Sequence, residues 1–229
     1  MNRNFTALCA AMLAFAIMLI VCGNILSNSR RFSFAESEDV KCVYLTFDDG
    51  PSDRVTPKIL DVLKEENVNA TFFIIGQQAQ TRKYLLQREI DEGHTVAVHS
   101  YTHEYGEIYS SPESLIKDID KCNEVIKSVT GKYSDLYRFP GGSYGLSEKL
   151  ISAVKEHGMK PIDWNASFSD AEIYNATPAQ IFDAAITSAD CCEKVVILAH
   201  DSTNKSATAL ALKDIIRHFK NQGYTFKAF

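Results

Sequence analysis

A chain of 229 residues is long enough for one well-packed domain and short for two. The apolar fraction of 45% and the charged fraction of 23% are ordinary for a globular protein. The net charge of -5 argues against a nucleic-acid partner, because binding to phosphates favours a basic surface.

The first 29 residues differ from the rest in composition. Arg3 precedes an almost uninterrupted apolar run over 7–22, and a polar stretch over 27–31 follows. This order is typical of a signal peptide, and an uncleaved membrane anchor fits it equally well. A lipid-modified Cys22 is disfavoured because the preceding residue is not small. We therefore predict three parts, a signal peptide or anchor (1–29), a linker (30–40) and a catalytic domain (41–229), with the domain secreted or anchored outside the cytoplasm.

After residue 41, strand-like and helix-like runs alternate. Val43, Leu45 and Phe47 alternate with Tyr44 and Thr46, and this period of two predicts a β-strand. Strands are predicted over 42–47, 70–75, 95–98, 136–139, 160–164, 194–199 and 224–229. Helices are predicted over 55–66, 77–92, 112–129, 147–157, 178–189 and 207–222.

The alternation predicts an α/β protein with parallel strands joined by right-handed crossovers. Seven such strands closing on themselves form a (β/α)7 barrel, one strand short of the usual eight, with the active site at the C-terminal ends of the strands. Ionisable residues do gather after the predicted strand ends: Asp48, Asp49, His99, His103, Arg138, Asp163 and His200. We therefore expect a single site on this rim.

Two histidines and one aspartate on the rim are spaced to bind a metal ion. His99 and His103 stand four residues apart, so a helical turn or a tight loop directs both imidazoles to one point. Asp49, at a neighbouring strand end, completes a two-histidine, one-carboxylate site with open positions for water and substrate. Zinc suits these ligands, and cobalt, nickel or iron fits the same geometry.

Such a metal site supports either hydrolysis or oxygen activation, and the other rim residues favour hydrolysis. Asp48 can act as general base toward a metal-bound water, and His200 can protonate a departing amine. An oxygenase needs a site for its co-substrate, and the sequence has no basic motif that would supply one. The residues therefore predict hydrolysis of an amide.

Five segments, in order, resemble the motifs of the polysaccharide deacetylase family, carbohydrate esterase family four: TFDDGPS (46–52), HSYTH (99–103), RFPGG (138–142), DW (163–164) and LAH (198–200). The resemblance implies a distorted seven-stranded β/α barrel. It also implies metal-dependent release of acetate from N-acetylated sugars, with Asp48 as base. The metal ligands that it implies are Asp49, His99 and His103.

The resemblance implies roles for further residues. Arg138 would orient Asp48 and hold it ionised, and Asp163 would keep His200 protonated. Trp164 and Leu198 would form the walls of a pocket for the acetyl methyl group, although plain core packing remains an alternative for Leu198.

One departure from the family concerns its third motif, which often has tyrosine where this chain has Gly141. The backbone N–H of Gly141 can still stabilise an oxyanion. A sugar contact made by the missing ring would pass to Tyr144, Tyr101 or Tyr105.

These features predict a monomeric deacetylase that acts on N-acetylglucosamine units of a cell-surface glycan, with peptidoglycan favoured by the predicted location. Chitin oligomers, another surface polysaccharide and acetylated xylan stay open as substrates. The export segment argues against a hydrolase of small amides. A catalytically silent glycan-binding module is the alternative from another class, and the presence of base, ligands and acid argues against it.

Overall fold

The computed structural model describes residues 41–190 and 192–229. The predicted signal peptide or anchor (1–29) and linker (30–40) lie outside these described residues. Within the described ranges, no helix has both the length and the apolar composition needed to cross a membrane.

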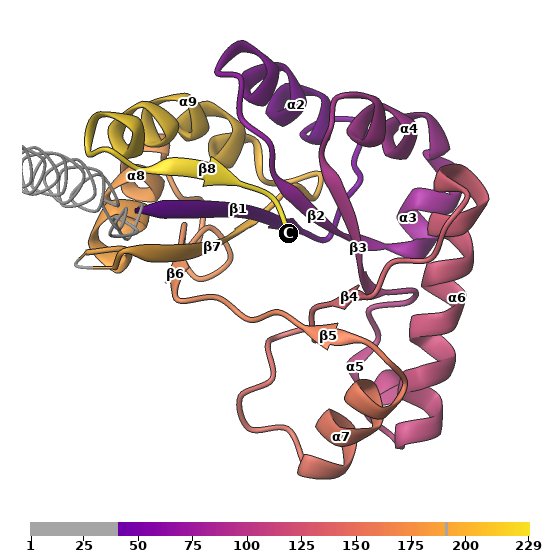
Figure 1. Ribbon diagram of the computed structural model, residues 1–229. Coiled ribbons are helices and arrows are strands. Elements are labelled where there is room, and N and C mark those ends of the chain that lie inside the picture. The colour runs from indigo at the N-terminus through magenta and orange to yellow at the C-terminus, as the bar shows by residue number, and fades with distance from the viewer. Residues whose placement is uncertain (1–40, 191) are drawn as a thin grey trace, which may run out of the picture. The chain divides into compact units, whose positions relative to one another are not determined.

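Parallel strands form one curled sheet with helices around its outer side (Figure 1). The strands are β1 (Cys42–Asp48), β2 (Thr71–Ile75), β3 (Thr95–Ser100), β4 (Leu136–Tyr137), β5 (Lys160–Pro161), β6 (Ala166–Ser167), β7 (Lys194–His200) and β8 (Thr225–Lys227). Their order is β5-β4-β3-β2-β1-β7-β6, and β8 pairs with β1. The end strands β5 and β6 do not pair with each other, so the sheet is a distorted (β/α)7 barrel, as predicted.

The seventh strand of the barrel is not the one that the sequence predicted. The predicted strand 224–229 corresponds to β8, which lies off the main path. β8 pairs with the first half of β1, and β2 pairs with the second half along the same edge of that strand. The barrel path is instead completed by β6, a strand too short to show a period of two in the sequence.

The helices lie close to their predicted positions. They are α2 (Thr56–Glu65), α3 (Gly76–Thr81), α4 (Lys83–Asp91), α5 (Tyr105–Ile108), α6 (Pro112–Thr130), α7 (Glu148–Glu156), α8 (Pro178–Ser188) and α9 (Ser206–Asn221). The predicted helix 77–92 is two helices, because the backbone of Arg82 leaves the helical region at φ -128° and ψ 39°. The short helix α5 was not predicted.

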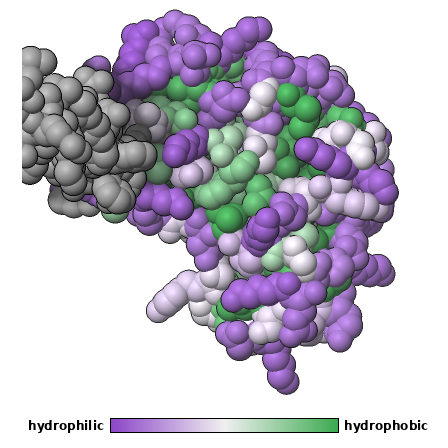
Figure 2. Space-filling view, viewed as in Figure 1, coloured by the Kyte–Doolittle hydropathy of each residue, from purple (hydrophilic) through white to green (hydrophobic). Residues whose placement is uncertain are grey.

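The first strand separates the core from the barrel interior. Val43, Leu45 and Phe47 are fully buried and belong to the same apolar core as Ile59 and Leu60 of α2. The residues between them on β1 therefore face the inside of the barrel. On the face shown in Figure 2, hydrophilic residues surround a central apolar area, where Figure 1 places the C-terminus.

The register of the strands brings site residues together. Asp48, the last residue of β1, pairs with His200 of β7 on one side and Phe73 of β2 on the other. Residues in register on neighbouring parallel strands share one face of the sheet. The predicted base and the predicted acid thus lie on the same inner face at the same rim.

Candidate active site

The turn after β1 is held by Asp201, through its backbone carbonyl and its carboxylate. The chain reverses at Asp49, whose φ is 73°, and Gly50 follows. A Cβ on Gly50 would lie 2.1 Å from an oxygen of Asp201, so only glycine fits. The Ser52 hydroxyl donates to the carbonyl of Asp201 at 2.6 Å, and the Thr56 hydroxyl donates to its carboxylate at 2.5 Å. These bonds set the direction in which both aspartates leave the strand.

Asp49, His99 and His103 converge as the sequence predicted. The Oδ1 atom of Asp49 lies 3.5 Å from Nε2 of His99 and 3.3 Å from Nε2 of His103. Their ligand atoms all lie within 4.8 Å of one another. This oxygen is buried and has no hydrogen-bond partner in the described part of the chain. An orphaned carboxylate oxygen between two imidazoles fits a bound divalent cation.

His99 is held with its Nε2 atom toward this point. The register of β3 against β2 shifts so that His99 has no partner residue on β2. Its Nδ1 lies 2.9 Å from the backbone carbonyl oxygen of Arg138. A carbonyl only accepts, so Nδ1 carries the proton and Nε2 presents a lone pair.

The loop after β3 places His103 in an uncommon backbone conformation, with φ at 62°. The Ser100 hydroxyl oxygen accepts the His103 N–H at 2.9 Å and donates to Asp118 at 2.6 Å. The same Asp118 carboxylate, from α6, accepts the N–H groups of Tyr101 and Thr102 at 2.7 and 3.0 Å. One side chain outside the predicted set thus shapes the whole loop that carries the second histidine.

Arg138 holds Asp48 as predicted. The fully buried guanidinium donates to Oδ1 of Asp48 at 2.9 Å and to the Thr46 hydroxyl at 2.6 Å. Its carbon Cζ lies 4.2 Å from the ring centroid of Phe73 and 5.5 Å from that of Trp164. The arginine is therefore packed against both rings, and the second oxygen of Asp48 lies 3.9 Å from Nε2 of His99, one of the candidate metal ligands.

His200 is paired with a carboxylate, but not with the predicted one. Its Nδ1 lies 2.7 Å from Oδ1 of Asp170, and its backbone N–H donates to Oδ2 at 3.0 Å. Burial lowers the pKa of His200, but Asp170, then Asp48 and Asp49, outweigh burial and raise it to about 9. The imidazole is therefore protonated at neutral pH.

The predicted pairing of Asp163 with His200 is wrong. Asp163 instead accepts hydrogen bonds from the N–H and the hydroxyl of Ser143, in the loop after β4. Asp170 follows β6, so the rule that site residues follow strand ends applies to it as well. Sequence reasoning missed it because β6 was not predicted.

The electrostatics of Asp49 and His103 favour the forms that bind a cation, whereas Asp48 and Asp49 raise the pKa of His99 against the effect of its burial. Burial raises the pKa of Asp49, but His99, His103 and His200 outweigh burial and hold it below its usual value. Burial lowers the pKa of His103, and the neighbouring His99 lowers it further. An ionised carboxylate and a neutral imidazole are the forms that bind metals.

Three of the remaining predicted residues lie at the rim, and the fourth, Tyr144, is fully exposed to solvent. Gly141, with φ at 78°, is exposed, and its N–H has no acceptor within the described residues. Leu198 is buried on β7 in register with Thr46, on the same inner face as the base. Trp164 is half-buried beside Arg138. Tyr144 is fully exposed, at 101%, and so contacts nothing in the site.

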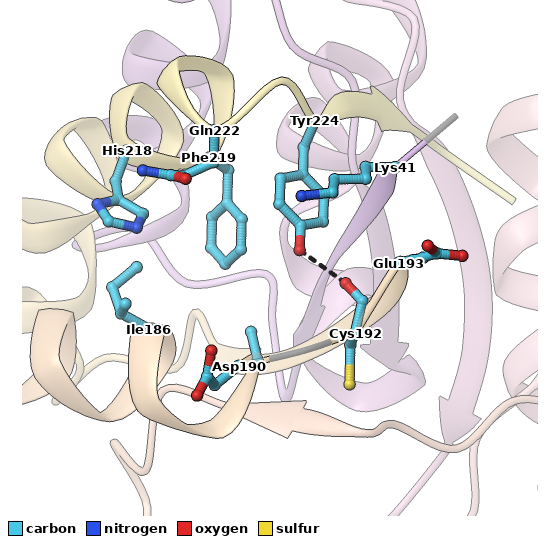
Figure 3. Close-up of a pocket in the computed structure, with 10 residues that line it drawn as sticks. Lys41, Ile186, Asp190, Cys192, Glu193, His218, Phe219, Gln222 and Tyr224 are labelled. Atoms are coloured by element: carbon cyan, nitrogen blue, oxygen red, sulfur yellow. Dashed lines mark hydrogen bonds between the residues drawn. The ribbon is translucent and has the colours of Figure 1, made fainter. Parts of the chain in front are cut away.

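A separate cavity of about 440 Å³ lies at the other end of the strands (Figure 3). Lys41 and Glu193 line it just before β1 and β7 begin. Figure 3 shows the Tyr224 hydroxyl directed at the carbonyl of Cys192, to which it donates at 2.7 Å. The one group of three potential metal ligands among the described residues lies at the opposite rim. We therefore place the candidate active site at that rim and not at this cavity.

A buried carboxylate, a group of two imidazoles and one carboxylate that could hold a metal ion, and a protonated histidine lie on the rim of this β/α barrel, and together they fit a metal-dependent hydrolase. A family model described as polysaccharide deacetylase matches residues 35–162. The chain belongs to this family, as the motifs indicated, and it is a polysaccharide deacetylase.

Known proteins extend this result. The chain is 36% identical over 195 residues to a peptidoglycan-N-acetylglucosamine deacetylase of Bacillus cereus, covering 82% of this chain and 69% of that one. It is also 36% identical over 191 residues to the peptidoglycan-N-acetylmuramic acid deacetylase PdaA of Bacillus subtilis, covering 82% and 70%. A solved CE4 esterase of Streptococcus mutans superimposes with a TM-score of 0.78 at 34% identity, covering 82% and 86%.

Proposed function

We propose that the protein removes acetyl groups from N-acetylglucosamine units of peptidoglycan and releases acetate. The observation that carries this proposal is the meeting of Asp48, the Asp49–His99–His103 cluster and His200 on one rim. Relatives named as peptidoglycan deacetylases support the choice of glycan. Chitin oligomers and acetylated xylan remain alternative substrates, and a silent glycan-binding module is the non-enzymatic alternative.

Asp49, His99 and His103 would hold a divalent cation, which when bound supplies Lewis acidity toward a water and the acetamide oxygen. We propose zinc, because imidazole and carboxylate ligands suit it, and cobalt, nickel or iron would fit the same donors. The buried, unpartnered oxygen of Asp49 supports a cation at this point.

Asp48 would take the proton from the attacking water, with Arg138 holding the carboxylate in place. The free N–H of Gly141 would donate to the oxygen of the tetrahedral intermediate. His200, oriented and kept protonated by Asp170, would give a proton to the departing amine. Asp48 would thus accept the proton that the water loses, and His200 would supply the proton that the amine nitrogen gains as the C–N bond breaks.

Trp164 and Leu198 would form the walls of the acetyl-methyl pocket. Both lie at the inner rim, where Leu198 is buried and Trp164 is half-buried. A pocket lined by apolar side chains excludes water from the reacting carbonyl and strengthens the nearby hydrogen bonds.

The cellular setting of the proposal depends on the N-terminal part of the chain. We propose that residues 1–29 export the protein or anchor it in the membrane, that 30–40 link this segment to the domain 41–229, and that the domain acts as a monomer facing the wall. Wall-directed relatives support this location.

The test is acetate release by the full chain from N-acetylglucosamine oligomers, acetylated xylan and purified peptidoglycan, with zinc or with a chelator. We expect metal-dependent acetate from wild type and none from Asp48→Asn or His200→Ala. Mass spectrometry of the digested wall then identifies the deacetylated sugar, since relatives named for N-acetylglucosamine and for N-acetylmuramic acid are equally similar. Glycan binding without acetate from any substrate would support the silent module instead.

A further inference from the structure

Gly141 leaves a space beside the metal site that another residue fills. A Cβ on Gly141 would lie 3.0 Å from the hydroxyl oxygen of Tyr105 and 3.3 Å from its Cε1. The Tyr105 phenol thus occupies the place where a side chain at position 141 would begin. Tyr105 is the first residue of α5 and follows His103 by two positions.

The other tyrosines considered for this place are occupied or distant. Tyr144 is fully exposed. Tyr101 is buried, its hydroxyl donates to Gln80 at 2.6 Å, and the Lys121 ammonium lies 3.8 Å from its ring centroid. The hydroxyl of Tyr101 is therefore already paired inside the protein, and the ring of Tyr144 packs against no part of the site in this structure.

Tyr105 is held firmly but keeps an open side. Its ring meets the imidazole of His103 edge-to-face, with centroids 5.4 Å apart and an interplanar angle of 84°. On another side it packs against Tyr109, whose hydroxyl donates to the carbonyl of Pro140 at 2.8 Å. Tyr105 is nevertheless 49% exposed, and its hydroxyl has no hydrogen-bond partner within the described residues.

Two unused hydrogen-bonding groups therefore adjoin each other at the rim, the hydroxyl of Tyr105 and the N–H of Gly141. Tyr105 begins the short helix α5 that follows β3, and Gly141 lies in the loop after β4. A rigid aromatic with a free hydroxyl beside a reaction site is suited to orienting a sugar, because the ring excludes water while the hydroxyl bonds to the ligand.

We propose that Tyr105 contacts the substrate: its hydroxyl hydrogen bonds with the N-acetylated sugar at the metal site, and its ring forms the wall that glycine at position 141 leaves open. This inference rests on the proposed deacetylase function for the identity of the sugar. The residue positions the ligand and transfers no proton.

The experiment compares Tyr105→Phe and Tyr105→Ala with wild type in the full zinc-loaded chain, using the N-acetylglucosamine pentamer. The matched control is Tyr133→Phe, since Tyr133 is similarly exposed, at 51%, but bonds to Glu124 and Lys127 away from the site. Loss of one neutral hydrogen bond should lower kcat/KM about three- to tenfold in Tyr105→Phe. The alanine variant should lose more, and the control should match wild type.

Two further measurements separate this proposal from its alternatives. Zinc affinity, measured by competition with a chromogenic chelator, should stay at the wild-type value in Tyr105→Phe. A loss of zinc affinity as large as the loss of kcat/KM would mean that Tyr105 supports His103 instead, and would overturn the proposal. Calorimetry of pentamer binding, in the Asp48→Asn background, tests the contact without turnover. If wild type releases no acetate, the proposed function fails, but this binding measurement still tests the role of Tyr105. An unchanged Kd on adding Tyr105→Phe would overturn the proposal.

Discussion

Asp170 binds His200 twice, through Nδ1 of the ring at 2.7 Å and through the backbone N–H at 3.0 Å. The carboxylate is itself buried and accepts the Thr208 hydroxyl at 2.6 Å. Because the carboxylate is fixed from α9, the ring of His200 has one orientation, with Nε2 free to face a substrate. The proposed acid therefore owes its orientation, and the largest favourable contribution to its raised pKa, to Asp170.

Replacing Asp170 should change the pH dependence of turnover. The raised pKa of about 9 means that protonated His200 is present below that pH and is lost as pH rises through it. Activity that needs this proton should fall over the same range. In Asp170→Asn the main partner that raises the pKa loses its charge, so the fall should begin at a lower pH.

The control for this experiment is Asp163→Asn. Asp163 bonds to Ser143 rather than to His200, so the alkaline fall in kcat should stay where it is in wild type. If the pH at which kcat falls shifted in Asp163→Asn but not in Asp170→Asn, the observed pairing of His200 with Asp170 would be contradicted.

Asp48→Asn should lower turnover by orders of magnitude while leaving metal binding in place. Loss of a general base typically lowers the rate by roughly 10²- to 10⁴-fold. Asparagine keeps an acceptor for the buried Arg138, and Asp48 is outside the ligand cluster, so zinc affinity should stay near that of wild type. Acetate release and zinc titration on one preparation check both statements, and loss of zinc binding would show that Asp48 is a ligand.

The strand-end rule explains why so much of the site could be predicted from sequence. Asp48, Asp49, His99 and His200 lie at the ends of strands of six or seven residues, which the sequence marks either by alternation, as in β1, or by a short apolar run, as in β7. Parallel pairing then places them on one rim without knowledge of any contact. Their convergence follows from topology alone.

The same rule fails where a strand is too short to be recognised. The two residues of β6 carry no periodic signal, so Asp170 was not predicted to be at the site. Pairing with His200 was predicted for Asp163 instead. Asp118 was missed for another reason. It lies on the helix α6, and nothing in its local sequence shows that it faces the loop 100–103. Such tertiary hydrogen bonds become visible only once α6 is packed beside β3.

Asp118→Asn should weaken metal binding although Asp118 is not a ligand. An amide has one acceptor oxygen, so part of the loop 100–103 loses its acceptor, and the left-handed backbone of His103 is no longer held. Removing such a supporting group typically lowers metal affinity by about 10- to 100-fold. Zinc competition titration measures the change. Asp120→Asn is the matched control on the same helix, because Asp120 pairs with His157 at the surface; equal affinities in the two variants would contradict the role of Asp118.

Gly50→Ala should destabilise the fold through a single contact. The added Cβ would lie 2.1 Å from the Asp201 carboxylate, which is buried and held by Thr56, so one of them must move. Overpacking of this kind costs about 1–3 kcal/mol or more in the free energy of unfolding. Thermal unfolding should show the loss, whereas Gly106→Ala, with nothing within 4 Å of the new Cβ, should unfold near the wild-type temperature. Asp201→Ala removes the atoms that clash, so the double variant should lose less stability than the two single variants together. Strict additivity would mean that Gly50 is required for a reason other than Asp201.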